Sequence, residues 1–256
     1  MNKYLKVEFK RATLSKNTII VFIITLLALI IAYVEANGIK GQHFLSEYDA
    51  VYIFMHIRWA ERASYLVIIA PLLATLVFSD SYLLEKEYGY LKNIYTKMTK
   101  RRYIFTKITV NAVVSGMIIT IAYFIMLAIL IAIHGINKAT NPPILETTLF
   151  SYIYYKHRFL YALVLIVNSF IFNAICATLA LGISPWIKNR YLTCLCPFFY
   201  WIFSGIILPH CMDLNILFTM NGDVTELNVI VYQVILFVIG ITSFYVGVRY
   251  PYEKDL

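Results

Sequence analysis

The residue types in this chain that could do chemistry are its five histidines, its four cysteines and its charged side chains. No two histidines lie at metal-ligand spacing on one predicted helix, and the C-x-C at 194–196 lacks the second pair that a zinc site needs. The sequence also lacks the G-x-x-x-x-G-K-[ST] phosphate loop, the H-E-x-x-H metal motif and the G-x-S-x-G nucleophile turn. We therefore expect no catalytic residue, no metal site and no cofactor in this chain, and we expect the cysteines to be small buried thiols.

The composition indicates where such a chain folds. Of the 256 residues, 61% are hydrophobic and only 14% are charged, whereas a soluble domain carries about 25% charged residues. This balance predicts an integral membrane protein, with a single domain over residues 1–256. The net charge of +8 is then expected to mark one side of the membrane rather than a nucleic-acid partner.

Six uncharged windows supply the predicted membrane spans. They cover residues 17–34, 63–79, 108–137, 159–187, 191–212 and 227–248. A spanning helix needs about 20 apolar residues, and uninterrupted runs of this length exclude the alternating pattern of barrel strands. The predicted fold class is an all-α integral membrane protein with six transmembrane helices. We expect the second span to run on to Leu84, and the fifth, which contains Pro197, to be either kinked or broken and re-entrant.

Lysine and arginine are divided unevenly between the two sides of such a bundle. With the N-terminus inside, the cytoplasmic segments hold sixteen of these residues and the outer segments hold six, so both termini and residues 80–107 are predicted to be cytoplasmic. Residues 3–16 are predicted to form an interfacial helix, with a solvated basic tail as the alternative. Its expected apolar face is Tyr4, Leu5, Phe9 and Ala12, and its expected headgroup contacts are Lys3, Lys6, Lys10 and Arg11.

Two outer segments are longer than simple turns. Residues 35–62 are too apolar for free solvent, so we expect a partial helix on the outer interface or a prolongation of the second span. Residues 138–158 contain the loop signal Asn141-Pro142-Pro143, followed by tyrosines that suit the headgroup level. Neither segment is long enough to form a separate soluble domain.

The most unusual stretch is residues 79–107, which lies between two apolar windows and carries seven of the 22 lysines and arginines. It also holds the acids Asp80, Glu85 and Glu87. Its apolar residues recur at three- and four-residue spacing, which predicts a short amphipathic helix and a cytoplasmic docking surface; they are Leu83, Leu84, Tyr88, Leu91, Ile94 and Tyr95. The alternative is a basic loop that binds lipid headgroups, although anionic lipid would repel its carboxylates.

All six windows lack aspartate, glutamate, lysine and arginine. Ionisable side chains at membrane depth are the usual sign of ion pumps and proton-coupled carriers. A proton-driven secondary transporter is therefore disfavoured, and any transport by this chain is expected to draw its energy from a partner.

Two sequence runs in the stretch resemble the ABC-2 type permease subunits of ABC transporters. They are E-K-E-Y-G-Y-L-K-N-I-Y-T-K at 85–97 and T-K-R-R-Y-I-F-T-K at 99–107. That family shows an acidic residue, a glycine, a leucine one turn on, then a basic pair and a lysine that opens the third span. Two residues depart from this pattern. Tyr90 stands where a small residue is common after the glycine, and Thr99 stands where Ser or Pro is frequent. The small size and short outer loops are similar to those of peptide or lantibiotic export and immunity permeases.

The resemblance implies that the stretch is a coupling helix, held in a groove of a separate ATP-binding subunit. The residues implied to contact that subunit are Glu85, Glu87, Tyr88, Gly89, Leu91, Lys92, Ile94, Tyr95, Arg101 and Arg102. It further implies two cytoplasmic ABC ATPase subunits that carry ATP and Mg²⁺, a second permease subunit in a homodimer or heterodimer, and a multi-pass location in a bacterial plasma membrane.

The expected cargo is a peptide or an amphipathic, lipid-like substrate, with large glycan or lipid exporters as the alternative class. Aromatic residues such as Trp59 and Trp201 motivate that expectation. A different class of function also stays open, namely a membrane anchor or assembly factor that transports nothing.

Overall fold

The computed structural model describes residues 2–40, 48–59, 65–136 and 148–250. Within these ranges the regular elements are all helices, and the one strand-like pairing is an isolated bridge between Thr148 and Asn221. The helices, in chain order, are α1 (Asn2–Thr13), α2 (Lys16–Lys40), α4 (Ala50–Trp59), α5 (Tyr65–Leu76), α6 (Ser81–Glu87), α7 (Tyr90–Lys97), α8 (Lys100–His134), α9 (Ser151–Lys156), α10 (Arg158–Ile183), α11 (Arg190–Ile207), η1 (His210–Met212), α12 (Leu214–Thr219) and α13 (Glu226–Arg249).

Six segments of the described chain are long and apolar enough to cross a membrane. They are Lys16–Ala36, Leu66–Glu87, Lys100–His134, Arg158–Ile183, Arg190–Ile207 and Glu226–Arg249. Each overlaps one of the six predicted windows, which confirms the all-helical class and the number of candidate spans. The side of the membrane on which each end lies stays a prediction.

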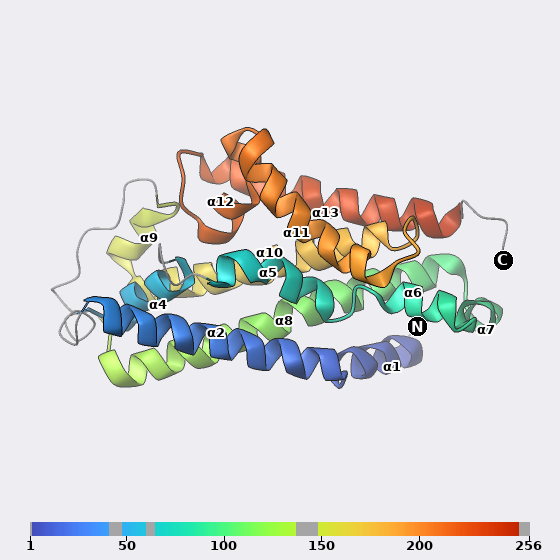
Figure 1. Cartoon of the computed structure of the whole chain (residues 1–256), viewed down its shortest axis with the longest axis horizontal. Coiled ribbons are helices and arrows are strands. Elements are labelled where there is room, and N and C mark those ends of the chain that lie inside the picture. The colour runs from blue at the N-terminus through green and yellow to red at the C-terminus, as the bar shows by residue number, and fades with distance from the viewer. Residues whose placement is uncertain (1, 41–47, 60–64, 137–147, 251–256) are drawn as a thin grey trace.

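Helix α10 lies at the centre of the bundle (Figure 1). Helix α10 packs along α8, α13 and α5, and α8 also packs against α2, α1 and α4. Helices α10 and α13 meet at Gly182 and Gly240, where a Cβ on Gly182 would lie 2.6 Å from the Gly240 carbonyl oxygen. Small residues permit such close approach, and packing is what drives helix association in lipid.

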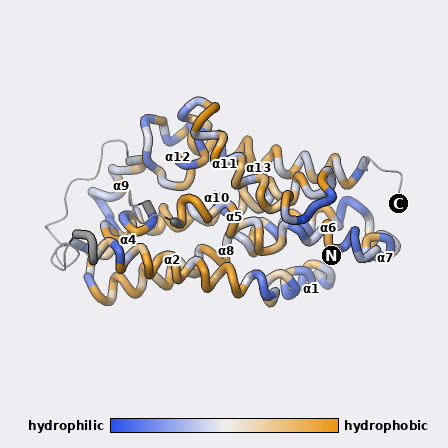
Figure 2. The backbone as a smooth tube through the Cα atoms, viewed as in Figure 1, coloured by the Kyte–Doolittle hydropathy of each residue, from blue (hydrophilic) through white to orange (hydrophobic). Residues whose placement is uncertain are grey.

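The two ends of the bundle carry different elements. Helices α1, α6 and α7 and the last turns of α13 lie at one end, whereas α4 and α9 lie at the other (Figure 1). Figure 2 shows hydrophobic residues along the middle of the long helices and hydrophilic residues toward the ends, including α1, α6 and α7. The segments predicted to be cytoplasmic therefore share one end of the fold, as that topology requires.

The second and fifth spans depart from simple helices. Helix α5 ends at Leu76, and a turn over 77–80 leads into α6, so the second span extends to Glu87, three residues beyond the predicted end at Leu84. Helix α11 continues through Pro197 and ends at Ile207. The chain leaves helical structure at 208–209, and the short helix α12 packs back against α11. Pro197 therefore does not break the fifth span, and the break follows α11.

The outer segments are partly built into the bundle. Helix α4 is the partial helix expected within 35–62, but it packs against α8 and α2, and its Phe54 and Ile57 are fully buried. In α9, Tyr152 and Tyr155 are exposed while Tyr154 is buried. The predicted loop at 141–143 lies outside the described residues, as does the side chain of residue 59.

Candidate functional site

The charged stretch 79–107 folds as two short helices followed by the start of α8, so the expectation of a single short helix is wrong. Helix α6 ends at Glu87, and Gly89 takes a left-handed conformation with φ of 70° before α7 begins at Tyr90. Glycine adopts this conformation without the steric cost that a Cβ adds. The apolar periodicity seen in the sequence is therefore divided into two segments at Gly89.

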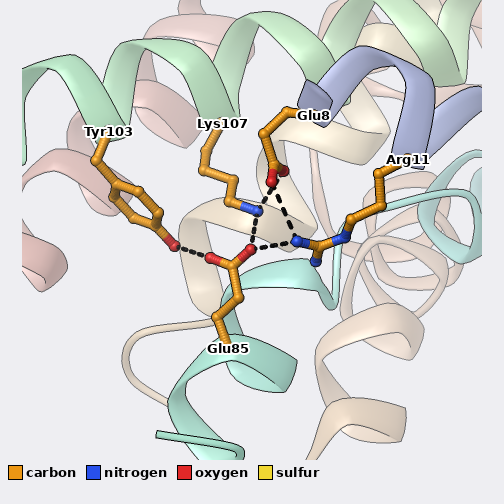
Figure 3. Close-up of polar contacts among 5 residues, drawn as sticks. All are labelled: Glu8, Arg11, Glu85, Tyr103 and Lys107. Atoms are coloured by element: carbon orange, nitrogen blue, oxygen red, sulfur yellow. Dashed lines mark hydrogen bonds and ion pairs between the residues drawn. The ribbon is translucent and has the colours of Figure 1, made fainter. Parts of the chain in front are cut away.

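Five side chains from three helices meet beside this turn; they are Glu8, Arg11, Glu85, Tyr103 and Lys107, which we call the charge cluster (Figure 3). Glu85 of α6 is its hub, because Oε1 accepts from Lys107 Nζ at 2.6 Å and from Arg11 Nη1 at 2.6 Å. The second oxygen, Oε2, accepts from the Tyr103 hydroxyl at 2.7 Å. Glu8 of α1 accepts from Lys107 Nζ at 2.8 Å and from Arg11 Nη1 at 3.1 Å.

The charge cluster is almost removed from solvent. Lys107 is 0% exposed, Glu85 2% and Glu8 3%. A buried ion costs several kcal/mol unless it is paired and hydrogen-bonded, and here two carboxylates each bridge the same two cations. The Phe78 ring centroid lies 4.9 Å from Lys107 Nζ and supplies a further favourable contact for the ammonium. The cluster therefore fixes α1, α6 and α8 to one another.

Arg11 is the part of the charge cluster that reaches solvent, with 42% of its side chain exposed. Burial alone would lower the pKa of its guanidinium, but Glu8 and Glu85 raise that pKa above its ordinary value. Arg11 is thus a permanent cation that joins buried carboxylates to the surface of α1.

The face that α1 turns toward the protein differs from the predicted one. Ala12 is buried and Tyr4 and Leu5 are half-buried, as expected, but the acid Glu8 shares that face and Phe9 is 37% exposed. Arg11, predicted to contact lipid headgroups, also binds Glu8 and Glu85 within the fold. The ion pairs from α1 to α6 and α8 set the orientation of α1, and they outweigh the apolar spacing that predicted Phe9 on its inner face.

Helix α7 has an inner face that packs on its own chain and an outer face that is free. Leu91 is 2% exposed, and half-buried Ile94 and Tyr95 pack against the same small core, which also contains Tyr103 and Phe244. The apolar face that contains Leu91, Ile94 and Tyr95 is therefore turned toward the core of this chain, and its implied contact with an ATPase subunit stays a prediction. The residues exposed on and beside α7 are Glu87, Tyr88, Gly89, Tyr90, Lys92, Asn93, Thr96 and Lys97.

The other predicted contact residues also divide between buried and exposed positions. Glu85, implied by the resemblance to contact the ATPase subunit, is instead buried in the charge cluster. Arg101 and Arg102 are exposed in the first turn of α8. Arg190, at the start of α11, lies 3.4 Å from Glu87 and 4.0 Å from Asp80, which links the fifth span to the end of α6.

Sequence reasoning missed how Glu8, Tyr103 and Lys107 function together. Two signals were present, since Glu8 is the only acid in the first sixteen residues and Tyr103 and Lys107 are one helical turn apart on an apolar helix. The uncharged windows ended at residue 79 and began again at residue 108, so Glu85 and Lys107 fell just outside them. The structure places both inside candidate spans.

The opposite end of the bundle holds a second set of buried charges. Asp49, which is 0% exposed, accepts from Arg158 Nη1 at 2.8 Å and from the Tyr52 amide at 2.9 Å at the start of α4. Arg58 is 2% exposed and donates to the Phe218 carbonyl at 2.8 Å. Burial lowers the pKa of the Arg58 guanidinium, a shift that nearby Tyr123 opposes. These contacts join α4 to α10 and α12.

The described residues contain no group of three or more His, Cys, Asp and Glu side chains that could hold a metal ion. All four cysteines are free; Cys176 and Cys194 are buried as expected, whereas Cys196 and Cys211 are half-buried. No family model, no curated protein and no solved structure matches this chain. The fold and site thus define an all-helical chain with six candidate membrane spans and a buried charge cluster at the end that carries α7.

Proposed function

We propose that this chain is the membrane-spanning subunit of an ABC-2 type transporter, driven by ATP hydrolysis on a separate cytoplasmic subunit. The observation that carries the proposal is the connection from an exposed helix to the spans. Helix α7 projects at the end of the bundle, and the preceding helix α6 is locked through Glu85 to α1 and α8. A force applied to α7 has a short, rigid route into the second and third spans.

The exposed face of α7 is suited to a protein partner. It presents Tyr88 and Tyr90, which are 68% and 57% exposed, together with Lys92 and Lys97. Exposed aromatic residues supply contact area, and charges around them set orientation and exclude wrong partners. In this proposal the partner is an ABC ATPase subunit, present in two copies with two permease subunits.

The test is co-expression with a candidate ABC ATPase, sought first in the reading frames that neighbour the gene for this chain, followed by purification and ATPase measurement. We expect the pair to copurify and the permease to raise ATP turnover. The substitution Tyr88→Ala, on the docking face, is expected to reduce both. The matched control is Tyr152→Ala, since Tyr152 is 62% exposed at the opposite end of the bundle.

Two results would count against the proposal. If the ATPase copurifies but its turnover does not change, the chain is an anchor or assembly factor rather than a permease. If Tyr88→Ala and Tyr152→Ala weaken capture equally, α7 is not the docking site. The proposed cargo is a peptide or an amphipathic molecule that the transporter exports or to which it confers immunity. This is tested by measuring the resistance to such peptides of cells that express both subunits.

A further inference from the structure

A pocket of about 320 Å³ lies between α1 and α7, beside the charge cluster. Its walls carry side chains that donate hydrogen bonds, among them Tyr4, Arg11, Asn93 and Lys97, and apolar side chains from Ile94 and Met98. Tyr90 and Glu85 complete the lining. Both oxygens of Glu85 are already engaged by Lys107, Arg11 and Tyr103, so the donors outnumber the acceptors that remain open.

The Tyr4 hydroxyl donates no hydrogen bond within the described fold. Its oxygen is buried, and it has no hydrogen-bond partner among the described residues. Burial, followed by the nearby charge of Glu8, raises the pKa of this hydroxyl above its ordinary value, so it stays a neutral O–H donor. A buried hydroxyl that lacks a partner is destabilising, which favours a ligand that accepts from it.

Arg11 and Lys97 give the pocket its charge. All of the hydrogen bonds described for Arg11 use Nη1, so Nε and Nη2 remain to donate. Lys97 is exposed and forms no ion pair within the described residues. A planar guanidinium beside an ammonium and neutral donors is the arrangement that binds phosphate oxygens.

The position of the pocket indicates the source of the phosphate. Glu85 lies in the last turns of the second candidate span and α8 begins at Lys100, so the pocket lies where the chain leaves the apolar spans. On the outside, α1 carries Val7 and is followed by Leu14, which are 60% and 67% exposed. Exposed apolar residues beside lysines are typical of a helix in contact with the membrane interface.

We propose that this pocket binds the phosphate of an anionic membrane phospholipid, with Tyr4, Arg11, Asn93 and Lys97 donating to its oxygens. The bound phosphate shares Arg11 with Glu8 and Glu85, so occupancy of the pocket adjusts how firmly α1 is held to α6. The pocket shares Tyr90 and Lys97 with the exposed face of α7 proposed to dock the ATPase, so lipid binding is measured on this chain alone, without that partner.

The test measures lipid binding to the whole chain in detergent by native mass spectrometry, with phosphatidylglycerol and phosphatidylcholine as probes. We expect a preferred phosphatidylglycerol site that Tyr4→Phe combined with Lys97→Gln weakens roughly tenfold, the effect of losing one or two charge-assisted hydrogen bonds. Tyr4→Phe keeps the ring and removes a hydroxyl that bonds nothing in the fold, so folding is preserved. The matched control is Tyr88→Phe combined with Lys92→Gln, two exposed residues outside the pocket.

Three results would overturn the inference. If the pocket variant and the control variant lose phosphatidylglycerol binding equally, the lipid is attracted to a basic surface in general and not to this pocket. Equal binding of both lipids would overturn the preference for an anionic lipid, because phosphatidylcholine carries the same phosphate with a compensating cation. Competition of inorganic phosphate with phosphatidylglycerol at equal concentration would identify a free anion, rather than a lipid headgroup, as the ligand.

Discussion

Helices α6 and α7 come from one charged run of sequence and are separated only by Tyr88 and Gly89, but they have opposite relations to the fold. Helix α6 is mostly buried, and its Glu85 accepts from three side chains on two other helices. Helix α7 buries only Leu91, and it keeps its lysines in solvent. The charges of α6 hold the bundle together, whereas those of α7 are free for a partner.

This contrast shows why charge content alone does not identify a docking surface. Glu85 and Glu87 lie only two residues apart at the end of α6, but they differ in role because Glu85 faces Lys107 whereas Glu87 faces solvent and Arg190. Only the buried carboxylate, Glu85, is needed for stability, because removing its partner leaves an uncompensated charge in a low dielectric. Substitutions in the two helices should therefore separate stability from partner binding.

The largest expected effect is that of Lys107→Met, which removes the ammonium shared by Glu8 and Glu85. Breaking a buried ion pair from one side costs about 3–5 kcal/mol. We expect the free energy of unfolding in detergent to fall by this amount, measured by denaturant titration. The control is Lys92→Met on the exposed face of α7, which should change stability by less than about 0.5 kcal/mol. Equal effects of the two substitutions would contradict the division between α6 and α7.

The next effect is that of Leu91→Ala, the one substitution in α7 expected to damage the fold. Leu91 is 2% exposed within the small core at this end of the bundle, and removing a buried leucine side chain costs about 2–4 kcal/mol. Half-buried Ile94 provides the comparison, because Ile94→Ala should cost clearly less. Thermal unfolding of both variants in the same detergent measures the difference. A neutral Leu91→Ala would mean that Leu91 points toward a partner instead.

The sequence was sufficient to predict the six spans, because long uncharged windows have only one stable form in lipid. The family resemblance also singled out Gly89, which has a φ of 70° in this structure, and its implied contact with an ATPase subunit stays a prediction. Local patterns carry this information because each depends on residues close together in the chain.

The charge cluster could not be predicted in the same way. Glu8 and Lys107 are 99 residues apart, and Arg11 and Glu85 are 74 apart. A basic residue near a membrane has two good partners, a lipid headgroup or a protein carboxylate, and the sequence does not distinguish them. Arg11 was assigned to the headgroups for this reason, and only the packing of α1 on α8 reveals its actual partners.

A smaller effect is expected for Tyr103→Phe, which removes one hydrogen bond to Glu85 Oε2. A hydrogen bond to a charged group contributes about 1.5–3 kcal/mol. Tyr95→Phe is the matched control, since the Tyr95 ring packs edge-on against Tyr103 at 5.4 Å but its hydroxyl forms no hydrogen bond within the described residues. Denaturant titration should show a loss for Tyr103→Phe and almost none for Tyr95→Phe. The reverse order would mean that the ring contact, not the carboxylate, stabilises this end.

The smallest effect is that of Gly89→Ala, which tests the hinge between the two helices. A Cβ at Gly89 meets no atom within 4 Å, so the substitution adds only the strain of a left-handed alanine, about 1–2 kcal/mol. Asparagine tolerates this conformation better, so Gly89→Asn should lose less stability than Gly89→Ala. If α7 transmits force into α6 through this turn, both variants should still bind the ATPase, while Gly89→Ala lowers the stimulation of ATP turnover more than Gly89→Asn. If Gly89→Ala and Gly89→Asn have the same stability and the same stimulation of ATP turnover, the left-handed conformation at residue 89 does not govern either property.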